Sequence, residues 1–226
     1  MNEDMVSFTG IKRWIDVTLP IGEDLPVWPG DPRPVFTVHP IEGPEGFQTT
    51  GISMGSHTGT HVDAPAHVEA GGRTLDQIPQ DRYIGPCQVI EVNTDESAIS
   101  WASIQPQLAP GFVRLLVKTP NSRRGYARGF DRGYQALSAE ALGRLRERGY
   151  ICVGIDYLSA APYGDGWAPH DAWLTGSDHI LIEGLDLRHV LPDIYYLMCL
   201  PLSLPGLDAA PARVVLGEAG GLDKKT

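Results

Sequence analysis

The chain has 226 residues, of which 42% are hydrophobic and 20% are charged, a composition typical of a globular protein with a sizeable core. Acidic residues outnumber basic ones by 28 to 18, which gives a net charge of −10. This balance argues against a nucleic-acid-binding protein, since such a protein needs a basic face to neutralise phosphates.

Residues 1–8 carry acidic side chains and lack the apolar core of a signal peptide. No later stretch approaches the roughly 18 to 20 apolar residues that a membrane span requires. Three widely spaced cysteines, Cys87, Cys152 and Cys199, include no Cys-x-x-Cys pair, a pattern that predicts reduced core thiols rather than disulfides. We therefore expect a cytoplasmic protein with no membrane segment.

Short apolar or β-branched runs, most of them bounded by glycine or proline, recur along the chain and predict strands. In chain order, these runs cover residues 35–39, 88–92, 113–119, 151–155, 180–183, 194–200 and 213–216. They predict a single α/β domain over residues 1–226 with more sheet than helix. The order of the strands stays open.

The clearest helix signal covers residues 138–148. Ser138 can cap its N-terminus, an apolar stripe includes Leu142 and Leu145, and Gly149 can end it. Because this helix leads directly into the apolar run 151–155, we expect a helix followed by a buried strand.

Residues 57–67 read His-Thr-Gly-Thr-His-Val-Asp-Ala-Pro-Ala-His and contain three of the seven histidines. Imidazole and carboxylate are the usual ligands of zinc and similar divalent ions. His57 and His61 have the helical spacing of the zincin motif, but the glutamate of His-Glu-x-x-His is missing and the glycine-rich run is a poor helix. The run therefore predicts a metal site of another kind.

An extended backbone would place His57, His61, Asp63 and His67 on one face, because their positions differ by even numbers. Four extended residues span roughly 13 Å, so two histidines can share an ion only if the chain bends, and Gly59 can supply the bend. We expect a tight ligand loop with one histidine left over. A chance cluster of histidines and a purely structural zinc site, which usually uses cysteine, are the alternatives.

Residues 51–55 match the Gly-x-Ser-x-Gly elbow of serine hydrolases around Ser53. That motif requires a helix after the serine, and no helix can begin across the glycine-rich segment that follows. We expect a strand and turn here that deliver His57.

The run from His57 to His67 meets, without a break, the pattern His-x-Gly-Thr-His-x-Asp-x-Pro-x-His. In this run the chain resembles the cyclase-like family of metal-dependent hydrolases, which includes bacterial kynurenine formamidase and isatin hydrolase. Further segments similar to that family lie at residues 26–32, 83–87, 153–156, 182–185, 200–202 and 207–213. The resemblance implies a swivelling β/β/α-type domain with a mixed, sheet-rich core, usually dimeric, that holds one or two divalent ions, zinc or manganese.

The resemblance also implies roles for individual residues. The first ion would be held by His57, His61 and Asp63, and Asp63 would bridge to a second ion. The second ion would take His170 and Glu183, and His67 would act as the catalytic acid/base. The interval from His170 to Glu183 is one residue longer than the resemblance predicts, so His179 is an alternative ligand.

A divalent ion lowers the pKa of bound water towards about 7, and a neutral imidazole such as His67 can then protonate the departing amine. The reaction expected from the resemblance is hydrolysis of a small aryl formamide, with N-formylkynurenine as the leading candidate. The alternatives are opening of a cyclic amide, as in isatin hydrolase, and a non-catalytic relative that binds a metal or small ligand. A metal-dependent dehydratase or cyclase is a further possibility.

Two segments bear on the substrate. Trp28, between prolines, either lines a pocket for an aryl group or packs in the core or at a dimer contact. Residues 156–162 depart from the formamidase pattern Asp-Thr-Pro-Ser-Leu-Asp-Pro, which predicts an altered substrate wall.

Overall fold

The computed structural model describes residues 10–40, 46–124, 126 and 129–219. Residues 1–8, for which we expected no signal peptide, lie outside the described part of the chain. No helix in the described part of the chain is long and apolar enough to cross a membrane.

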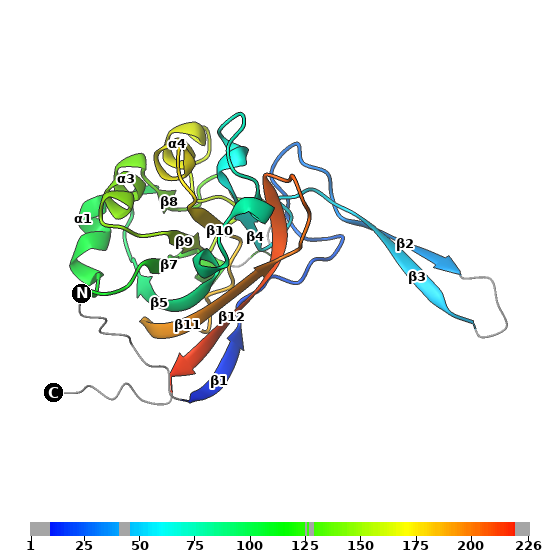
Figure 1. Ribbon diagram of the computed structural model, residues 1–226, viewed down its shortest axis with the longest axis horizontal. Coiled ribbons are helices and arrows are strands. Elements are labelled where there is room, and N and C mark those ends of the chain that lie inside the picture. The colour runs from blue at the N-terminus through cyan, green and yellow to red at the C-terminus, as the bar shows by residue number, and fades with distance from the viewer. Residues whose placement is uncertain (1–9, 41–45, 125, 127–128, 220–226) are drawn as a thin grey trace.

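The core of the structure is a closed, mixed β-barrel (Figure 1). Four neighbouring strands are parallel: β5 (Ile84–Glu91), β7 (Arg114–Lys118), β9 (Cys152–Ile155) and β10 (Ile180–Glu183). The antiparallel strands are β1 (Ile11–Asp16), β4 (His61–Asp63), β11 (Asp193–Pro201) and β12 (Ala209–Ala219). Strand β4 closes the barrel because it pairs with β10 on one side and with β12 on the other.

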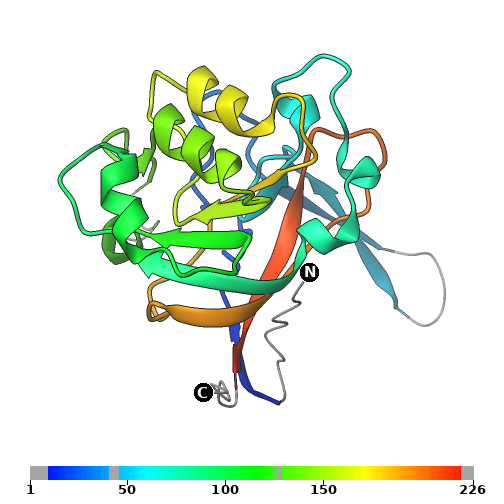
Figure 2. The same ribbon diagram turned by 60° about the vertical axis from the view of Figure 1, so that its left-hand side comes forward.

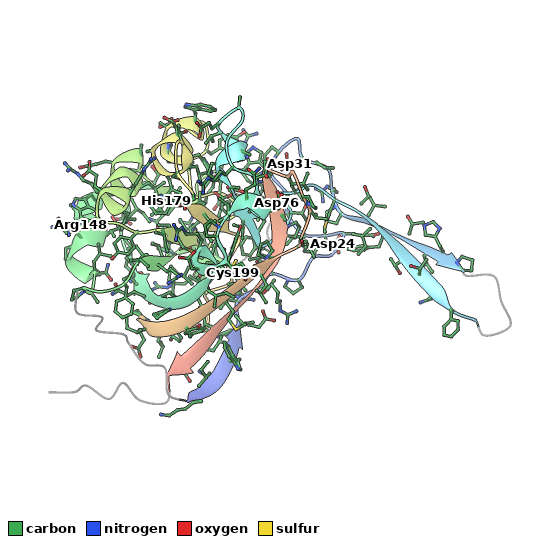
Figure 3. All side chains as sticks on the ribbon, viewed as in Figure 1. Asp24, Asp31, Asp76, Arg148, His179 and Cys199 are labelled. Atoms are coloured by element: carbon green, nitrogen blue, oxygen red, sulfur yellow. The ribbon has the colours of Figure 1, made fainter. Side chains whose placement is uncertain are left out.

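Helices cover the parallel strands on one side of the barrel. They are α1 (Trp101–Ile104), α3 (Ala139–Glu147) and α4 (Trp167–Leu174), while α2 (Asn121–Arg124) follows β7 (Figures 1 and 2). Successive strand residues alternate between two cores. Leu116 and Cys152 face the barrel interior, whereas Leu115 and Val153 pack with the helices. Cys199 belongs to the interior cluster (Figure 3).

Short elements complete the fold. Strands β6 (Ala98–Ile99) and β8 (Ala136–Leu137) form a small parallel pair, and four 3-10 turns lie in the connections. These turns are η1 (Pro65–His67), η2 (Leu75–Gln77), η3 (Gln80–Arg82) and η4 (Gln105–Gln107). Strands β2 (Val35–Pro40) and β3 (Gln48–Ser53) form a separate hairpin that projects from the barrel.

The predicted α/β class with more sheet than helix is confirmed, and each of the seven predicted strands overlaps an observed one. The predicted helix is α3, where the Ser138 side chain accepts a hydrogen bond from the Ala141 N–H at 3.1 Å. The strand expected to deliver His57 is β3. Strands β1 and β4 and helix α4 were not predicted, because they are short or lack a clear amphipathic period.

Gly184, directly after β10, has a positive φ of 69° and lies against the backbone of Gly59. A Cβ at position 184 would overlap the Gly59 carbonyl oxygen, so Gly184→Ala combines a left-handed strain with a backbone clash. We expect a loss of at least about 2 kcal/mol in the free energy of unfolding, measured by urea denaturation. Gly111→Ala is the matched control, because Gly111 has φ 85° but open space around its Cβ position. It should lose only about 1 kcal/mol from strain, and an equal loss in both variants would contradict the close approach.

Candidate metal centre and substrate pocket

Strand pairing brings the acidic and imidazole side chains together. Strand β4 carries His61 and Asp63, and in its antiparallel pairing with β10 His61 stands directly opposite Glu183. Opposed residues of antiparallel strands project to the same face, so both side chains enter the same space. Helix α4 adds His170 to this group, with its Nε2 3.2 Å from Glu183 Oε1.

Two backbone carbonyls fix the hydrogen positions on the two buried histidines. His61 Nδ1 lies 2.9 Å from the Gly59 carbonyl oxygen, and His170 Nδ1 lies 2.6 Å from that of Gly166. A carbonyl oxygen only accepts, so each Nδ1 carries the hydrogen and donates it. In the neutral imidazoles, each Nε2 therefore keeps a lone pair, as in metal-binding histidines whose other ring nitrogen donates to a backbone carbonyl.

These lone pairs point at carboxylate oxygens. His61 Nε2 lies 3.4 Å from Asp63 Oδ1 and 3.3 Å from Glu183 Oε2. His61 Nε2 and both Asp63 oxygens are buried and have no hydrogen-bond partner among the described residues. Acceptors that converge without a donor are costly in a dry interior unless protons or a cation lie between them.

The electrostatics of the group favour positive charge at its centre. Burial works to lower the pKa of His170, but its contact with Glu183 outweighs this and raises the pKa to about 9. Burial works to raise the pKa of Asp63, whereas the neighbouring imidazoles, His57 first, hold it well below its usual value. Without a metal, the raised pKa of His170 keeps a proton on its Nε2, facing Glu183. A divalent cation would replace that proton, and the two histidines and two carboxylates then form a donor set that fits it.

His57 joins the group from the loop that precedes β4. Its Nδ1 lies 2.9 Å from Asp63 Oδ1, and its Nε2 lies 3.0 Å from Asp208 Oδ2. Burial works to lower the pKa of His57, but these two carboxylates, Asp63 first, raise it to about 11. The ligand atoms of His57, His61 and Asp63 all lie within 4.8 Å of one another, the spacing that one ion requires. The expected bend at Gly59 is present, with φ 68°.

His67 lies at the edge of the group, in the turn η1. Its side chain is 31% exposed, whereas the side chains of His61 and Asp63 are fully buried. Its ring centroid lies 4.3 Å from that of His57 and 5.4 Å from that of His170. His67 therefore lies beside the other site residues, and its ligand atom also lies within 4.8 Å of those of Asp63 and His170.

Asp208, just before β12, is a site residue that the sequence analysis missed. Its Oδ2 accepts from His57 and, at 3.3 Å, from His67 Nδ1. These hydrogen bonds hold the pKa of Asp208 well below its usual value. The segment 207–213 was noted for its family-like sequence, but a role for Asp208 requires the pairing of β12 with β4, which a single sequence does not contain.

A cavity of about 300 Å³ opens beside the cluster. Four site residues line it, namely His57, His67, His170 and Glu183. The rest of the lining is largely aromatic and apolar and consists of Trp28, Asp31, Val68, Leu158, Ser159, Gly166 and Trp167. Trp28 lies edge-on to Phe130, with ring centroids 5.1 Å apart, so it both lines the cavity and packs against an aromatic cluster. Leu158 and Ser159 come from the segment predicted to alter the substrate wall.

His179, the alternative ligand, lies elsewhere. Its ring packs on Trp173 with centroids 4.7 Å apart, and burial lowers its pKa. Figure 3 shows it near α4, apart from Asp31, which lines the cavity. Of the two candidates His170 and His179, it is therefore His170 that faces Glu183.

Comparisons with known proteins identify relatives over most of the chain. The family model described as a putative cyclase matches residues 15–162. The kynurenine formamidases of Bacillus mycoides and Bacillus anthracis are each 34% identical over 207 residues, which cover 91% of this chain and 97% of the relative.

Solved structures share the fold. A potential metal-dependent hydrolase with cyclase activity is 32% identical with a TM-score of 0.77, and the match covers 92% of this chain and 99% of that chain. Isatin hydrolase A from Labrenzia aggregata is 23% identical with a TM-score of 0.74, over 92% of this chain and 94% of that chain. At this lower identity, the second comparison supports the fold alone.

Proposed function

The chain belongs to the cyclase family, and we propose that it is an arylformamidase that hydrolyses the amide C–N bond of a small aryl formamide such as N-formylkynurenine. Like its relatives, the protein is a metal-dependent hydrolase that acts on a non-peptide C–N bond. The observation that carries the proposal is the convergence of the buried His61 Nε2 and Asp63 oxygens, whose hydrogen-bonding capacity the described residues leave unfilled, beside an aromatic cavity.

We propose that His57, His61 and Asp63 hold one divalent ion, and that His170, Glu183 and the second oxygen of Asp63 can hold another. Glu183 supports a two-ion site, because its Oε2 faces His61 and its Oε1 faces His170. Zinc or manganese suits this set of nitrogen and oxygen donors. When bound, a divalent ion supplies hydroxide at neutral pH and polarises the amide carbonyl.

The side chains around the ion then supply proton transfer and orientation. His67 lines the cavity and exchanges its proton with the departing arylamine nitrogen. Asp208 engages Nδ1 of His67, which leaves Nε2 for that transfer. Trp28 and Trp167 present flat apolar surfaces in the cavity that suit an aryl ring.

We further propose a cytoplasmic homodimer. The three cysteines are buried and free, which fits a reducing compartment. Burial raises the thiol pKa of each, although Arg114 opposes this at Cys87 and Cys152, so we expect none of them to be a reactive nucleophile.

The direct test is metal analysis combined with turnover. The purified protein, after chelation and reloading with zinc or manganese, would be assayed on N-formylkynurenine and on isatin. We expect metal-dependent release of formate from the first substrate. Turnover of isatin alone would favour a lactam-opening enzyme, and bound metal without turnover of either substrate or of a wider amide panel would indicate a binding protein.

Replacing Asp208 by Asn should lower kcat by about 10- to 100-fold while the metal content stays unchanged, because the neutral amide no longer holds His57 and His67. Metal is measured by mass spectrometry alongside kcat. Asp178→Asn, which removes a carboxylate paired with Arg82 away from the cavity, is the matched control. Parallel loss of metal and activity in Asp208→Asn would instead make Asp208 a ligand.

A further inference from the structure

Asp31 is a charged residue of the cavity wall that the proposed reaction does not use. It is half-buried and lines the cavity together with Trp28. Among the described residues, it belongs to none of the groups whose ligand atoms could share a metal ion. Within the same part of the chain its carboxylate makes no hydrogen bond or ion pair, because the hydrogen bond of this residue is made by its backbone N–H. The carboxylate is therefore free to bind a group of the substrate.

A tight turn fixes Asp31 next to Trp28. Residues 28–31 read Trp-Pro-Gly-Asp, and the Asp31 N–H donates to the Trp28 carbonyl oxygen at 3.0 Å. Pro29 at the second position and Gly30, with φ 105°, at the third are the residues that a type II turn favours. Such a turn holds the Cα atoms of its first and last residues within about 7 Å. The indole ring and the carboxylate therefore reach the cavity from one short, rigid segment.

The Trp28 ring is itself held in place by other aromatic rings. Its centroid lies 5.1 Å from that of Phe130 and 5.5 Å from that of Tyr163. Because the ring is packed and the turn is rigid, the spacing between the aromatic face and the Asp31 carboxylate is fixed before a substrate enters. A substrate that uses both must carry an aromatic ring and a second group at a matching distance.

A positively charged group is the one that this wall favours. A hydrogen bond between a carboxylate and an ammonium group is roughly twice as strong as one between neutral groups. The faces of Trp28 and Trp167, which line the same cavity, also attract cations. A metal ion at Asp31 would find no further histidine or carboxylate ligands grouped there among the described residues. An organic ammonium group is therefore the cation that fits.

We propose that Asp31 is a specificity-determining residue that binds an ammonium group of the substrate while the aryl ring of the substrate lies on Trp28. The inference rests on the proposed arylformamidase function and adds a requirement to it. Besides the ring and the formamide, the preferred substrate carries a protonated amine a few bonds away from the ring. N-formylkynurenine has such an amine on the third carbon of its side chain, whereas a plain formanilide has none.

The cavity offers each part of such a substrate its own contact. His57 and His67 line the cavity at the metal centre, where the formamide must lie for its C–N bond to be cleaved. Asp31 contacts a group that keeps the same charge throughout the reaction. An interaction that is equally strong in the ground state and the transition state lowers KM and leaves kcat unaffected. We therefore expect the contribution of Asp31 to appear in KM.

The test compares two substrates that differ only in this group, namely N-formylkynurenine and its des-amino analogue, in which hydrogen replaces the ammonium group. We expect the wild-type protein to have a kcat/KM about 10- to 100-fold higher for N-formylkynurenine, the contribution of one hydrogen bond between charged groups. Asp31→Asn should lower this preference by about 10-fold or more, mainly by raising KM for N-formylkynurenine, because the amide keeps the shape of the side chain but not its charge.

Asp24→Asn is the matched control. Asp24 precedes the same turn, is exposed and is absent from the cavity lining, and Figure 3 shows it apart from Asp31. Its variant should keep the wild-type preference. Metal content, measured for both variants, shows whether a change in kcat/KM comes from the metal centre, and we expect Asp31→Asn to bind as much metal as the wild-type protein.

A binding experiment judges Asp31 without turnover. Calorimetry gives the dissociation constants of kynurenine, the product expected from the proposed reaction, and of its des-amino analogue. Wild-type protein should bind kynurenine more tightly, and Asp31→Asn should lose this preference. A wild-type protein that does not distinguish the two compounds, or an equal loss for both in Asp31→Asn, would overturn the proposal. A preference that depends on Asp31 in a protein that hydrolyses no formamide would support the ammonium site and contradict the proposed function.

Discussion

Replacing Asp63 by Asn is expected to abolish binding of the divalent ion and to lower turnover by about 10³-fold or more. Asp63 lies at the centre of the ligand group, with one oxygen 2.9 Å from His57 Nδ1 and the other 3.8 Å from His170 Nε2. Both oxygens are buried, and apart from the close contact of Oδ1 with His57 neither has a hydrogen-bond partner among the described residues. An isosteric amide removes the negative charge and offers donor hydrogens to the ion. Loss of several kcal/mol of charge stabilisation in the transition state corresponds to this reduction.

The measurement combines metal content with thermal unfolding at increasing zinc or manganese. Ligand binding to the native state raises the unfolding temperature of the wild-type protein, and the variant should show no such rise. Asp178→Asn should behave as wild type, because Asp178 makes its ion pairs with Arg73 and Arg82 outside the cavity. A full complement of metal in Asp63→Asn would show that the ion is held elsewhere.

The strands that were predicted correctly share one property. Parallel strands such as β7, β9 and β10 are buried on both faces, so their sequences are nearly continuous apolar runs that stand out between turns. Helix α3 was predicted because a cap, an apolar stripe and a terminal glycine agree. Helix α4 was missed because its first turn contains Pro169 and its apolar residues do not keep to one face.

The site residues likewise divide into those that the sequence predicted and those that depend on strand pairing. Four of the side chains lie within eleven residues, so their spacing alone predicted a metal site in this run, and the resemblance then assigned His57, His61 and Asp63 to one ion. The resemblance supplied His170 and Glu183, which strand pairing and α4 bring to the same place. Asp208 lies 141 residues after His67 and reaches it only because β12 pairs with β4. Contacts of this range depend on strand order, which periodicity does not encode.

The exposed face of the β2–β3 hairpin could not be predicted for a related reason. The apolar run over residues 35–39 predicted a strand, and a strand of this kind is normally covered on one face. A sequence reports that a face is apolar but not which surface covers it. The structure adds that the described part of the same molecule does not cover it.

Replacing His67 by Ala is expected to leave the metal content unchanged and to lower kcat by about 10²- to 10⁴-fold, the usual contribution of general acid–base catalysis. His67 is more exposed than the buried His61 and His170, the proposed ligands, and it lies on the wall of the cavity. An imidazole in this position can exchange protons with both solvent and substrate, whereas the two buried histidines have their Nε2 atoms committed to the ligand group.

The leaving group provides the discriminating measurement for His67. If this histidine protonates the departing amine, the kcat deficit of His67→Ala should shrink for formanilides whose amines are weaker bases, because these need less help to leave. His179→Ala, which alters a histidine packed on Trp173, should retain both metal and turnover. If His67→Ala loses metal in proportion to activity, His67 belongs to the ligand set. This alternative is geometrically feasible, because the ligand atom of His67 lies within 4.8 Å of those of Asp63 and His170.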